Sequence, residues 1–431
     1  MGILAAVVVL AVAVMHVALL RPAWLLPLMV VAGILCSRPT FVGERYPWLG
    51  PTILMGSAAV ALVVRGKSER RIAFWPVVLV LLAGAWSIVH EMLVPESEPN
   101  LWTTFLTFSL PLLSFHFIAR DLALLSQVSR ALVAVVSSAA VLTAVSVLAG
   151  LLIGWGRLHI GSLPLGYERI NSGLLLPGSL IYGSDLGNGI PRFLGLGREP
   201  GMGAIFIGWA YFAMPKNWRW RKLLQAALLV ALAATQSTTG IGLFGVALAM
   251  YWVWGQKRFN PFVALVGLGI GCYVAWIAIT NPDFGFLAKF HSSGTSFIDR
   301  NKATQAGLDA FVGQPFTATT DAPLSSINLI ATAAVTGAPW VVLIFLLMFA
   351  PVWRGMRLGR MNPALYSSAL ILVTMVSSQP VAGSTAILVL VLMNYYSIEK
   401  REKAPQSATE LPGKPSRRHG MTTQSKLLVR R

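Results

Sequence analysis

The chain has 431 residues, of which 55% are hydrophobic and only 12% are charged. A soluble protein of this length carries about twice that charged fraction, so the composition excludes an ordinary soluble enzyme and indicates an integral membrane protein. The net charge of +18 is typical of basic cytoplasmic loops in such proteins, and we expect no nucleic-acid partner.

Long apolar runs predict an all-α fold, a polytopic transmembrane helical bundle of about 12 to 14 spans with two long extracytoplasmic loops. A helix needs about 20 apolar residues to cross a hydrocarbon core of ~30 Å. Residues 1–398 are expected to form the bundle, and residues 399–431 a basic, disordered cytoplasmic tail. In chain order, thirteen spans are predicted near 2–20, 23–36, 50–64, 73–90, 101–118, 130–155, 201–215, 223–236, 238–254, 261–280, 325–351, 364–378 and 381–397.

The charges between these spans predict the orientation. One set of loops and the tail hold 25 Lys+Arg and 5 Asp+Glu, a net charge of +20, whereas the other set holds 9 and 11, a net charge of −2. The positive-inside rule places the first set, and with it the C-terminus, in the cytoplasm. An odd number of spans then places the N-terminus outside. The basic set comprises Arg21, 65–71, 119–130, 216–222, 256–258, 354–360 and 399–431; the other set comprises 37–49, 91–100, 157–200 and 281–323.

Two extracytoplasmic segments, 157–200 and 281–323, are much longer than a turn. Loops beyond about 12–15 residues are usually functional or disordered. Both segments contain aromatic residues that can pack onto the bundle, so we expect ordered loops with short helices.

Four arginines lie in the first long loop, on the side where the positive-inside rule disfavours them. One interpretation is that they contact lipid phosphates or form salt bridges within the loop. The other is an anion site, because guanidinium groups bind phosphate through paired hydrogen bonds. Gly201 and Gly203, at the start of the following span, are expected to present backbone N–H groups to the same anion. The four arginines are Arg157, Arg169, Arg192 and Arg198.

In the second long loop, the run from Asp299 to Lys302 adds two cations, Arg300 and Lys302. Taken alone, this run is typical of a solvated charge cluster. The other interpretation is that these cations join those of the first long loop in one anion site.

The sequence lacks the motifs expected for dinucleotide binding, metal binding and ion-coupled transport. The G-x-G-x-x-G run from Gly240 to Gly245 lies inside an apolar span, with no strand before it, and indicates helix packing. Histidines occur without a second ligand at helical spacing, so no metal site and no cofactor are predicted. The span interiors contain no Asp, Glu, Lys or Arg, which argues against an ion-coupled transporter.

Taken in order, three segments of 190–350 resemble the O-antigen polymerase and O-antigen ligase superfamily of bacterial inner-membrane glycosyltransferases. The first, "RFLGLGREPG", supplies Arg192, Gly195, Glu199 and Pro200 ahead of a span. The second is a Ser-rich turn that opens a helix at 237–240. The third has Arg300, then Pro315 about a dozen residues on, and Gly337 beside the next span. The glycines that usually follow the proline are replaced here by 316–319.

The resemblance implies metal-independent glycosyl transfer on the extracytoplasmic face, in O-antigen, capsule or exopolysaccharide assembly. Donor and acceptor would both be glycans on undecaprenyl diphosphate. Arg192 and Arg300 would bind the diphosphate, supported by Arg198, and Arg169 and Lys302 are further substrate-binding candidates. Glu199 is the first candidate for the base on the acceptor hydroxyl, and Asp321 is the second. Implied partners are membrane lipids, a chain-length regulator and a flippase of the same pathway.

Three alternatives remain open, and one of them is a non-catalytic assembly subunit, which would not need arginines in both long loops. An O-antigen ligase would transfer finished glycan to lipid A core or to a protein, but ligases of this group usually have a His near the position of Ser326, where this chain has none. A lipid-glycan flippase or anion transporter would use the loop arginines to guide its substrate, and would be expected to show repeated halves and broken helices near mid-membrane.

Overall fold

The computed structural model describes residues 22–37, 47–65, 73–94, 105–163, 172–183, 190–254, 294–317, 327–358, 363–377 and 385–402, and positions 269 and 273. Several predictions therefore lie outside the described residues. These are the span at 2–20, most of the span at 261–280, the tail from 403 on, and the site candidates Arg169 and Asp321.

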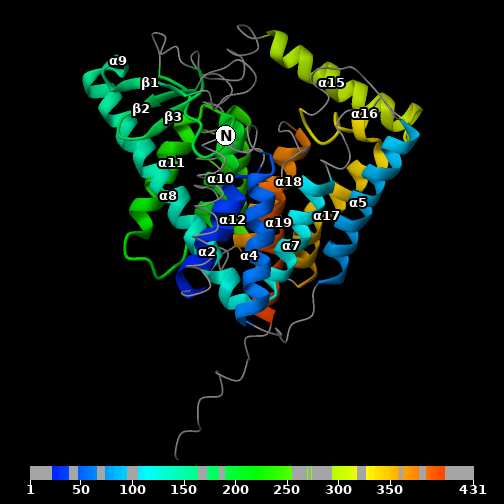
Figure 1. Cartoon of the computed structure of the whole chain (residues 1–431). Coiled ribbons are helices and arrows are strands. Elements are labelled where there is room, and N and C mark those ends of the chain that lie inside the picture. The colour runs from blue at the N-terminus through cyan, green and yellow to red at the C-terminus, as the bar shows by residue number, and fades with distance from the viewer. Residues whose placement is uncertain are drawn as a thin grey trace, which may run out of the picture.

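The described chain is mostly helical and has one small sheet (Figure 1). Its elements are α2 (Pro22–Leu35), α4 (Leu49–Arg65), α5 (Phe74–Leu93), the π-helix η1 (Phe105–Ser109), α7 (Leu110–Ala119), α8 (Leu122–Ile153), α9 (Trp155–Leu158), β1 (His159–Leu163), β2 (Ser172–Leu175), β3 (Ser179–Ile181), α10 (Pro200–Ala213), α11 (Arg221–Ala234), α12 (Thr238–Trp254), α15 (Gly294–Gly313), α16 (Ala333–Thr336), α17 (Ala338–Arg357), α18 (Pro363–Ser377) and α19 (Thr385–Glu402).

Three described helices, α5, α8 and α17, are long and apolar enough to cross a membrane. Their outer faces remain apolar. In α8, for example, Leu148 and Leu152 are 62% and 83% exposed, whereas Leu132 and Val136 are buried. An apolar exposed face suits hydrocarbon and not water, so these helices indicate a membrane protein. The described chain also has seven shorter apolar helices of 10–17 residues.

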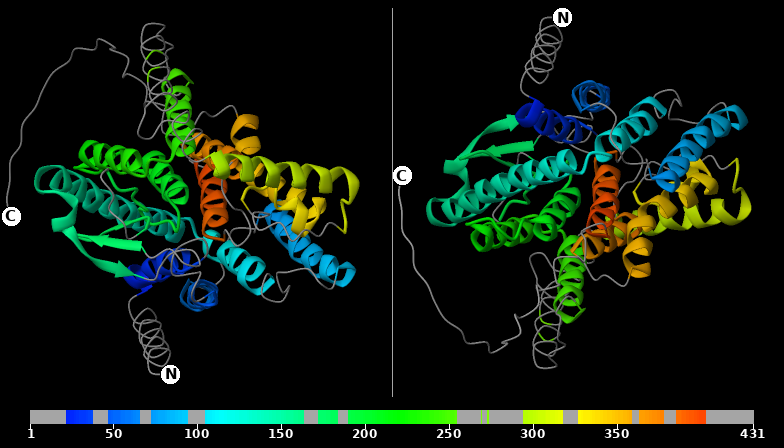
Figure 2. Two further views of the ribbon diagram at one scale, coloured as in Figure 1. Left: turned by 90° about the horizontal axis from the view of Figure 1, so that it is seen from above. Right: turned by 90° about the horizontal axis from the view of Figure 1, so that it is seen from below.

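Helix α19 lies in the middle of the bundle (Figure 2). Its residues from Ala386 to Met393 are at most 1% exposed. Polar side chains tie it to its neighbours: Thr385 Oγ1 donates to the carbonyl oxygen of Thr107 (2.9 Å), and Tyr396 Oη lies 2.8 Å from His116 Nδ1. Such interhelical hydrogen bonds fix helix register where apolar packing alone is not selective.

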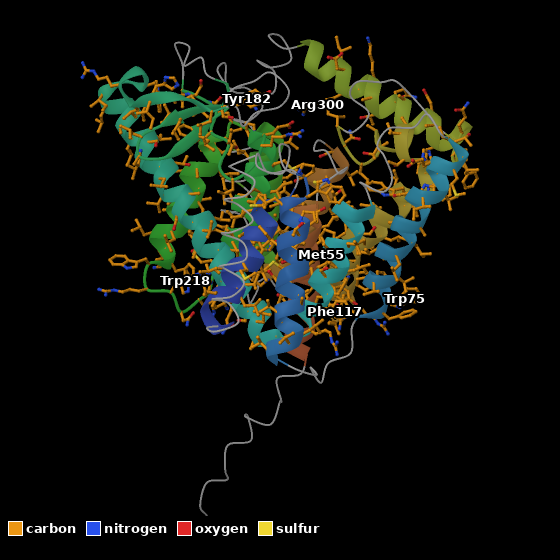
Figure 3. The ribbon with its side chains drawn as sticks, viewed as in Figure 1. Met55, Trp75, Phe117, Tyr182, Trp218 and Arg300 are labelled. Atoms are coloured by element: carbon orange, nitrogen blue, oxygen red, sulfur yellow. The ribbon has the colours of Figure 1, made fainter. Side chains whose placement is uncertain are left out.

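The candidate site and the basic loops lie at opposite ends of the bundle. Figure 3 shows Tyr182 and Arg300 at one end, with the small sheet and α15, and Trp75 and Trp218 at the other. Trp218 belongs to the loop 216–222, and Trp75 follows the loop 65–71, both from the predicted cytoplasmic set. We call the end with Tyr182 and Arg300 the site end, and the other the basic end.

The structure of the first long loop differs from the prediction of short helices within an all-α fold. Residues 159–181 instead form a three-stranded antiparallel sheet in the order β1-β2-β3. The only described helix between α8 and the sheet is the single turn α9. Ser146 Oγ of α8 donates to the Leu176 carbonyl oxygen (2.8 Å), which seats the sheet on the bundle.

Four further predictions need correction. Residues 122–130 were predicted as a loop but form the first turns of α8, because Asp121 Oδ1 caps the helix by accepting from Ala123 N (2.8 Å). In the span predicted at 101–118, the first described residues form the π-helix η1, which precedes α7. The span at 325–351 is broken at Gly337, whose φ is 75°. The predicted tail starts too early, since α19 continues to Glu402.

Gly337 permits a close meeting of three segments. A Cβ at this position would lie 3.0 Å from the Pro315 carbonyl oxygen and 3.3 Å from the Trp86 ring. Ala338 N donates to the same Pro315 oxygen (2.8 Å), and Trp86 Nε1 donates to the Thr336 oxygen (2.8 Å). Pro315 and Gly337 of the third segment are therefore in direct contact.

We expect Gly337→Ala to destabilise the protein by about 1–3 kcal/mol, because a side chain at this positive φ is strained and also meets Pro315. Thermal unfolding in detergent, followed by circular dichroism, measures the change. Gly242→Ala is the matched control, since a Cβ there meets nothing within 4 Å and alanine favours a helix. Equal melting temperatures for the wild type and Gly337→Ala would contradict the expectation.

Candidate functional site

Arg192 is held in place as part of an added edge strand. Tyr182 N donates to the Arg192 carbonyl oxygen (2.7 Å), and Leu194 N donates to the Leu180 oxygen (3.0 Å). Ile181 and Phe193 form the antiparallel bridge between them. Residues 192–194 thus extend the sheet beyond β3, and backbone pairing fixes the position of Arg192.

Phe193 anchors this edge strand to the bundle. Its ring is fully buried, with the Trp155 ring centroid 6.2 Å away. Its backbone N–H donates to the Ala234 oxygen at the end of α11 (3.0 Å). Since Phe193 faces the core, the neighbouring side chains Arg192 and Leu194 leave on the opposite side of the strand.

Glycines let the segment after Arg192 fold tightly over the start of α10. Gly195 has a φ of 59°. A Cβ on Gly203 would collide with the Leu194 carbonyl oxygen, and one on Gly197 with Gly203 N. The prediction that Gly203 presents its N–H to an anion is wrong, because that N–H donates to the Glu199 oxygen (3.0 Å).

The second segment of the resemblance also lies at this end. Ser237 Oγ accepts from Gly240 N (3.2 Å), the geometry of a helix N-cap, so Ser237 opens α12 as predicted. A Cβ on Gly240 would lie 2.6 Å from Ala204 Cβ of α10. The Ser-rich turn therefore packs α12 closely against α10 and supports the segment that carries Glu199.

Arg198 and Glu199 form an ion pair where α10 begins. Arg198 Nη2 lies 3.6 Å from Glu199 Oε1, and the two side chains are 11% and 31% exposed. Glu199 is the N-cap residue of α10, but its side chain makes no capping hydrogen bond. The carboxylate is thus directed to Arg198 and not to the helix.

Arg300 comes from the second long loop, on α15. The Arg300 carbonyl oxygen accepts from Thr304 Oγ1 (2.8 Å), which in turn accepts from Asn328 Nδ2 (2.9 Å). Asn328 is 2% exposed, and its Oδ1 accepts from Ala331 N (2.7 Å). Asn328 therefore ties the turn that carries Arg300 to the segment before α16.

Burial and neighbouring charges shift the pKa values of Arg192 and Tyr182. The pKa of Arg192 is lowered, first by burial, and Arg300 adds a further lowering, while Tyr182 and Glu199 act in the opposite direction. The Arg192 Cζ lies 5.6 Å from the centroid of the Tyr182 ring. The pKa of Tyr182 is raised, first by burial and then by Glu199, against the effects of Arg192 and Arg198.

These five residues, Tyr182, Arg192, Arg198, Glu199 and Arg300, form what we call the arginine cluster. Three guanidinium groups and one carboxylate give it a net charge of +2. The Nε atoms of Arg192 and Arg300 are buried and have no hydrogen-bond partner among the described residues. Buried donors without partners cost free energy, so an anion that accepts from them would be bound strongly.

Among the described residues, the remaining candidates are not part of this cluster. Lys302 is exposed and lies about 200° around α15 from Arg300, so it points to another side. Arg157 is exposed on α9. Sequence reasoning missed Tyr182 and Asn328, because a single Tyr or Asn in a loop belongs to no motif. Only the contact of Tyr182 with Arg192, and that of Asn328 with Thr304 on α15, reveals their roles.

In the part of the chain that the structure describes, His, Cys, Asp and Glu residues do not form any group of three or more that could hold a metal ion. No protein-family model, no curated protein and no solved structure matches the chain.

Proximity of the two loops can be measured by cross-linking. In a chain with Cys36 and Cys272 replaced by Ser, we expect Arg192→Cys and Arg300→Cys to be joined by a short bifunctional thiol reagent, detected by peptide mass spectrometry. Arg192→Cys with Lys302→Cys is the control, because Lys302 is on another face of α15. Equal cross-linking of the two pairs would contradict the arrangement.

Asn328→Ala should loosen α15 and reduce the Arg192–Arg300 cross-link, because a buried polar tie worth about 1–3 kcal/mol is lost. Gln305→Ala is the matched control. Its side chain bonds Asp309 within the exposed part of the same helix (2.8 Å), so the cross-link should persist. A cross-link unchanged by Asn328→Ala would show that other contacts seat the helix.

Proposed function

We propose that the chain is a membrane glycosyltransferase that polymerises oligosaccharide repeat units carried on undecaprenyl diphosphate. The observation that carries this proposal is that Arg300 lies at the same end of the bundle as Tyr182, which packs beside Arg192, and that the Arg300 charge lowers the pKa of Arg192 (Figure 3). The resemblance assigns both to one diphosphate, although 107 positions separate them in the sequence. The net charge of +2 in the arginine cluster is complementary to a diphosphate diester.

In the proposed reaction, the acceptor hydroxyl oxygen attacks the anomeric carbon of the donor glycan. The bond between that carbon and the diphosphate oxygen breaks, and the lipid diphosphate leaves with the bonding electrons. Arg192 and Arg300 stabilise the charge that develops on this leaving group. Preorganised donors of this kind contribute much of the rate enhancement of many enzymes.

The proton of the acceptor hydroxyl needs a base within hydrogen-bond reach. We assign this role to Glu199, with Asp321 as the second candidate. Glu199 is supported by its partial exposure and by Arg198, which holds the carboxylate beside the cluster. The extracytoplasmic face of a bacterial inner membrane is the proposed location, since the arginine cluster lies at the end opposite the basic loops.

Tyr182 is proposed as a positioning residue. Its ring lies against the Arg192 guanidinium, and such a contact with a desolvated cation is worth about 2 kcal/mol. A ring on one side of the guanidinium plane leaves the N–H groups in that plane directed to the substrate phosphate. The Tyr182 contact thereby limits the orientations that Arg192 can adopt.

Removing either arginine tests the proposal. In the host strain, Arg192→Ala and Arg300→Ala should each reduce polymerisation about 100-fold or more, as loss of a transition-state donor does, leaving single repeat units on the surface. Gel analysis of surface polysaccharide measures chain length. Arg192→Lys should be intermediate, because an ammonium cannot pair two oxygens in a plane.

Arg157→Ala is the control for that experiment, because Arg157 is an exposed arginine at the same end of the bundle. It should leave chain length normal. Long polymer at normal levels in Arg192→Ala would overturn the assignment. Polymer of normal length that fails to be attached to lipid A core or protein would instead identify the chain as a ligase.

A further inference from the structure

A cavity of about 370 Å³ lies at the basic end, far from the arginine cluster. Its volume is within the range of roughly 300–1,000 Å³ that ligand sites occupy. Its wall is made by the end of α10, the loop 213–216, and the nearby parts of α8, α11, α12, α18 and α19. Figure 3 labels Trp218 in the α10–α11 loop, at the opposite end from Tyr182 and Arg300.

Two cations line this cavity, Lys216 and Arg221, and none of the described residues that line it is acidic. The Nε atom of Arg221 is buried and has no hydrogen-bond partner among the described residues. A partly buried cation without a counter-charge is unfavourable, so the cavity favours an anion.

Neutral polar groups complete the lining. Asn394 is 4% exposed; its Oδ1 accepts from Trp209 Nε1 (3.2 Å), and its Nδ2 donates to Ser367 Oγ (3.1 Å). Ser129, Gln225 and Ser397 add further hydroxyl and amide groups. The donors of Asn394 and Ser397 are used within the protein, since Asn394 Nδ2 also donates to Ser368 Oγ (3.0 Å) and Ser397 Oγ donates to the Met393 carbonyl oxygen (2.7 Å). Hydrogen-bond donors to oxygen atoms of a ligand therefore come from Ser129, Gln225 and Ser367.

The helix geometry adds to the positive potential. Helix α11 begins at Arg221 and has no side-chain cap, and α18 begins at Pro363; both residues line the cavity. The N-terminus of a helix carries partial positive charge and free N–H groups, which favour phosphate. Here two such ends accompany two cations at one cavity.

Packed aromatic rings support the shape of the cavity: Phe212 and Tyr251 line it, and Tyr366 packs against both. Phe212 packs with Tyr251 and Tyr366 at ring-centroid distances of 5.9 and 6.3 Å, and the Tyr251 and Tyr366 rings lie 5.4 Å apart. Packed rings of this kind resist collapse of a cavity. The cations therefore face a preformed space.

We propose that this cavity binds a phosphate group, presented either by an anionic lipid headgroup or as free phosphate. The site is separate from the proposed glycan site and does not depend on it. Lys216 and Arg221 bind the phosphate oxygens. Ser129, Gln225 and Ser367 donate to the rest of the headgroup or to its water.

The test uses the purified full-length chain in detergent and two probes. Retention of phosphatidylglycerol against phosphatidylcholine is measured by native mass spectrometry, and inorganic phosphate binding by calorimetry. The variant is Lys216→Gln with Arg221→Gln. The matched control is Arg219→Gln with Lys222→Gln, which removes the same charge from the same loop outside the cavity.

If a lipid supplies the phosphate, the wild type retains phosphatidylglycerol selectively, and the Lys216/Arg221 variant loses about tenfold or more in retention while the control does not. If free phosphate is the source, the same loss occurs for inorganic phosphate without lipid selectivity. Binding of neither probe, or equal losses in both double variants, overturns the proposal. Should the double variant fail to fold, Lys216→Glu, a change at an exposed side chain, must produce the same loss.

Discussion

The arrangement of the site end depends on holding two like charges close together in a partly buried place. Burial and the Arg300 charge both disfavour the charged form of Arg192, and repulsion between the guanidinium groups acts to separate the two long loops. The sheet holds Arg192, and the α15–α16 contact holds Arg300. An anion bound between the two guanidinium groups, as proposed above, would relieve this repulsion.

Sequence reasoning succeeded where the signal is local. Long apolar runs bounded by charges predicted α2, α4, α10, α11, α12 and α18 to within a few residues. The link between Glu199 and Arg192 was predictable because both belong to one short segment. Arg300 was paired with Arg192 only through the family resemblance, since composition and periodicity say nothing about which loops meet.

Other features depend on contacts that no local pattern records. The strands within 159–181 have only three to five residues each, two of them contain Gly, and Pro177 follows β2, so in sequence they resemble a loop. Gly203 looked like an anion-binding glycine but serves close packing against Leu194. Residues from six helices line the cavity at the basic end. In the sequence, Lys216 and Arg221 are two of several cations in a basic loop, and no pattern indicates that they face a cavity.

The position of helix α15 also depends on one glycine. Gly307 lies so near the backbone of Ile330 that no side chain fits between the two segments, and this contact lies away from Arg300 itself. A side chain at position 307 would push α15 away from the segment around Ile330 and move the Arg300 guanidinium with it. The placement of Arg300 therefore depends on a glycine two turns farther along the same helix, which carries no charge and makes no contact with the arginine cluster.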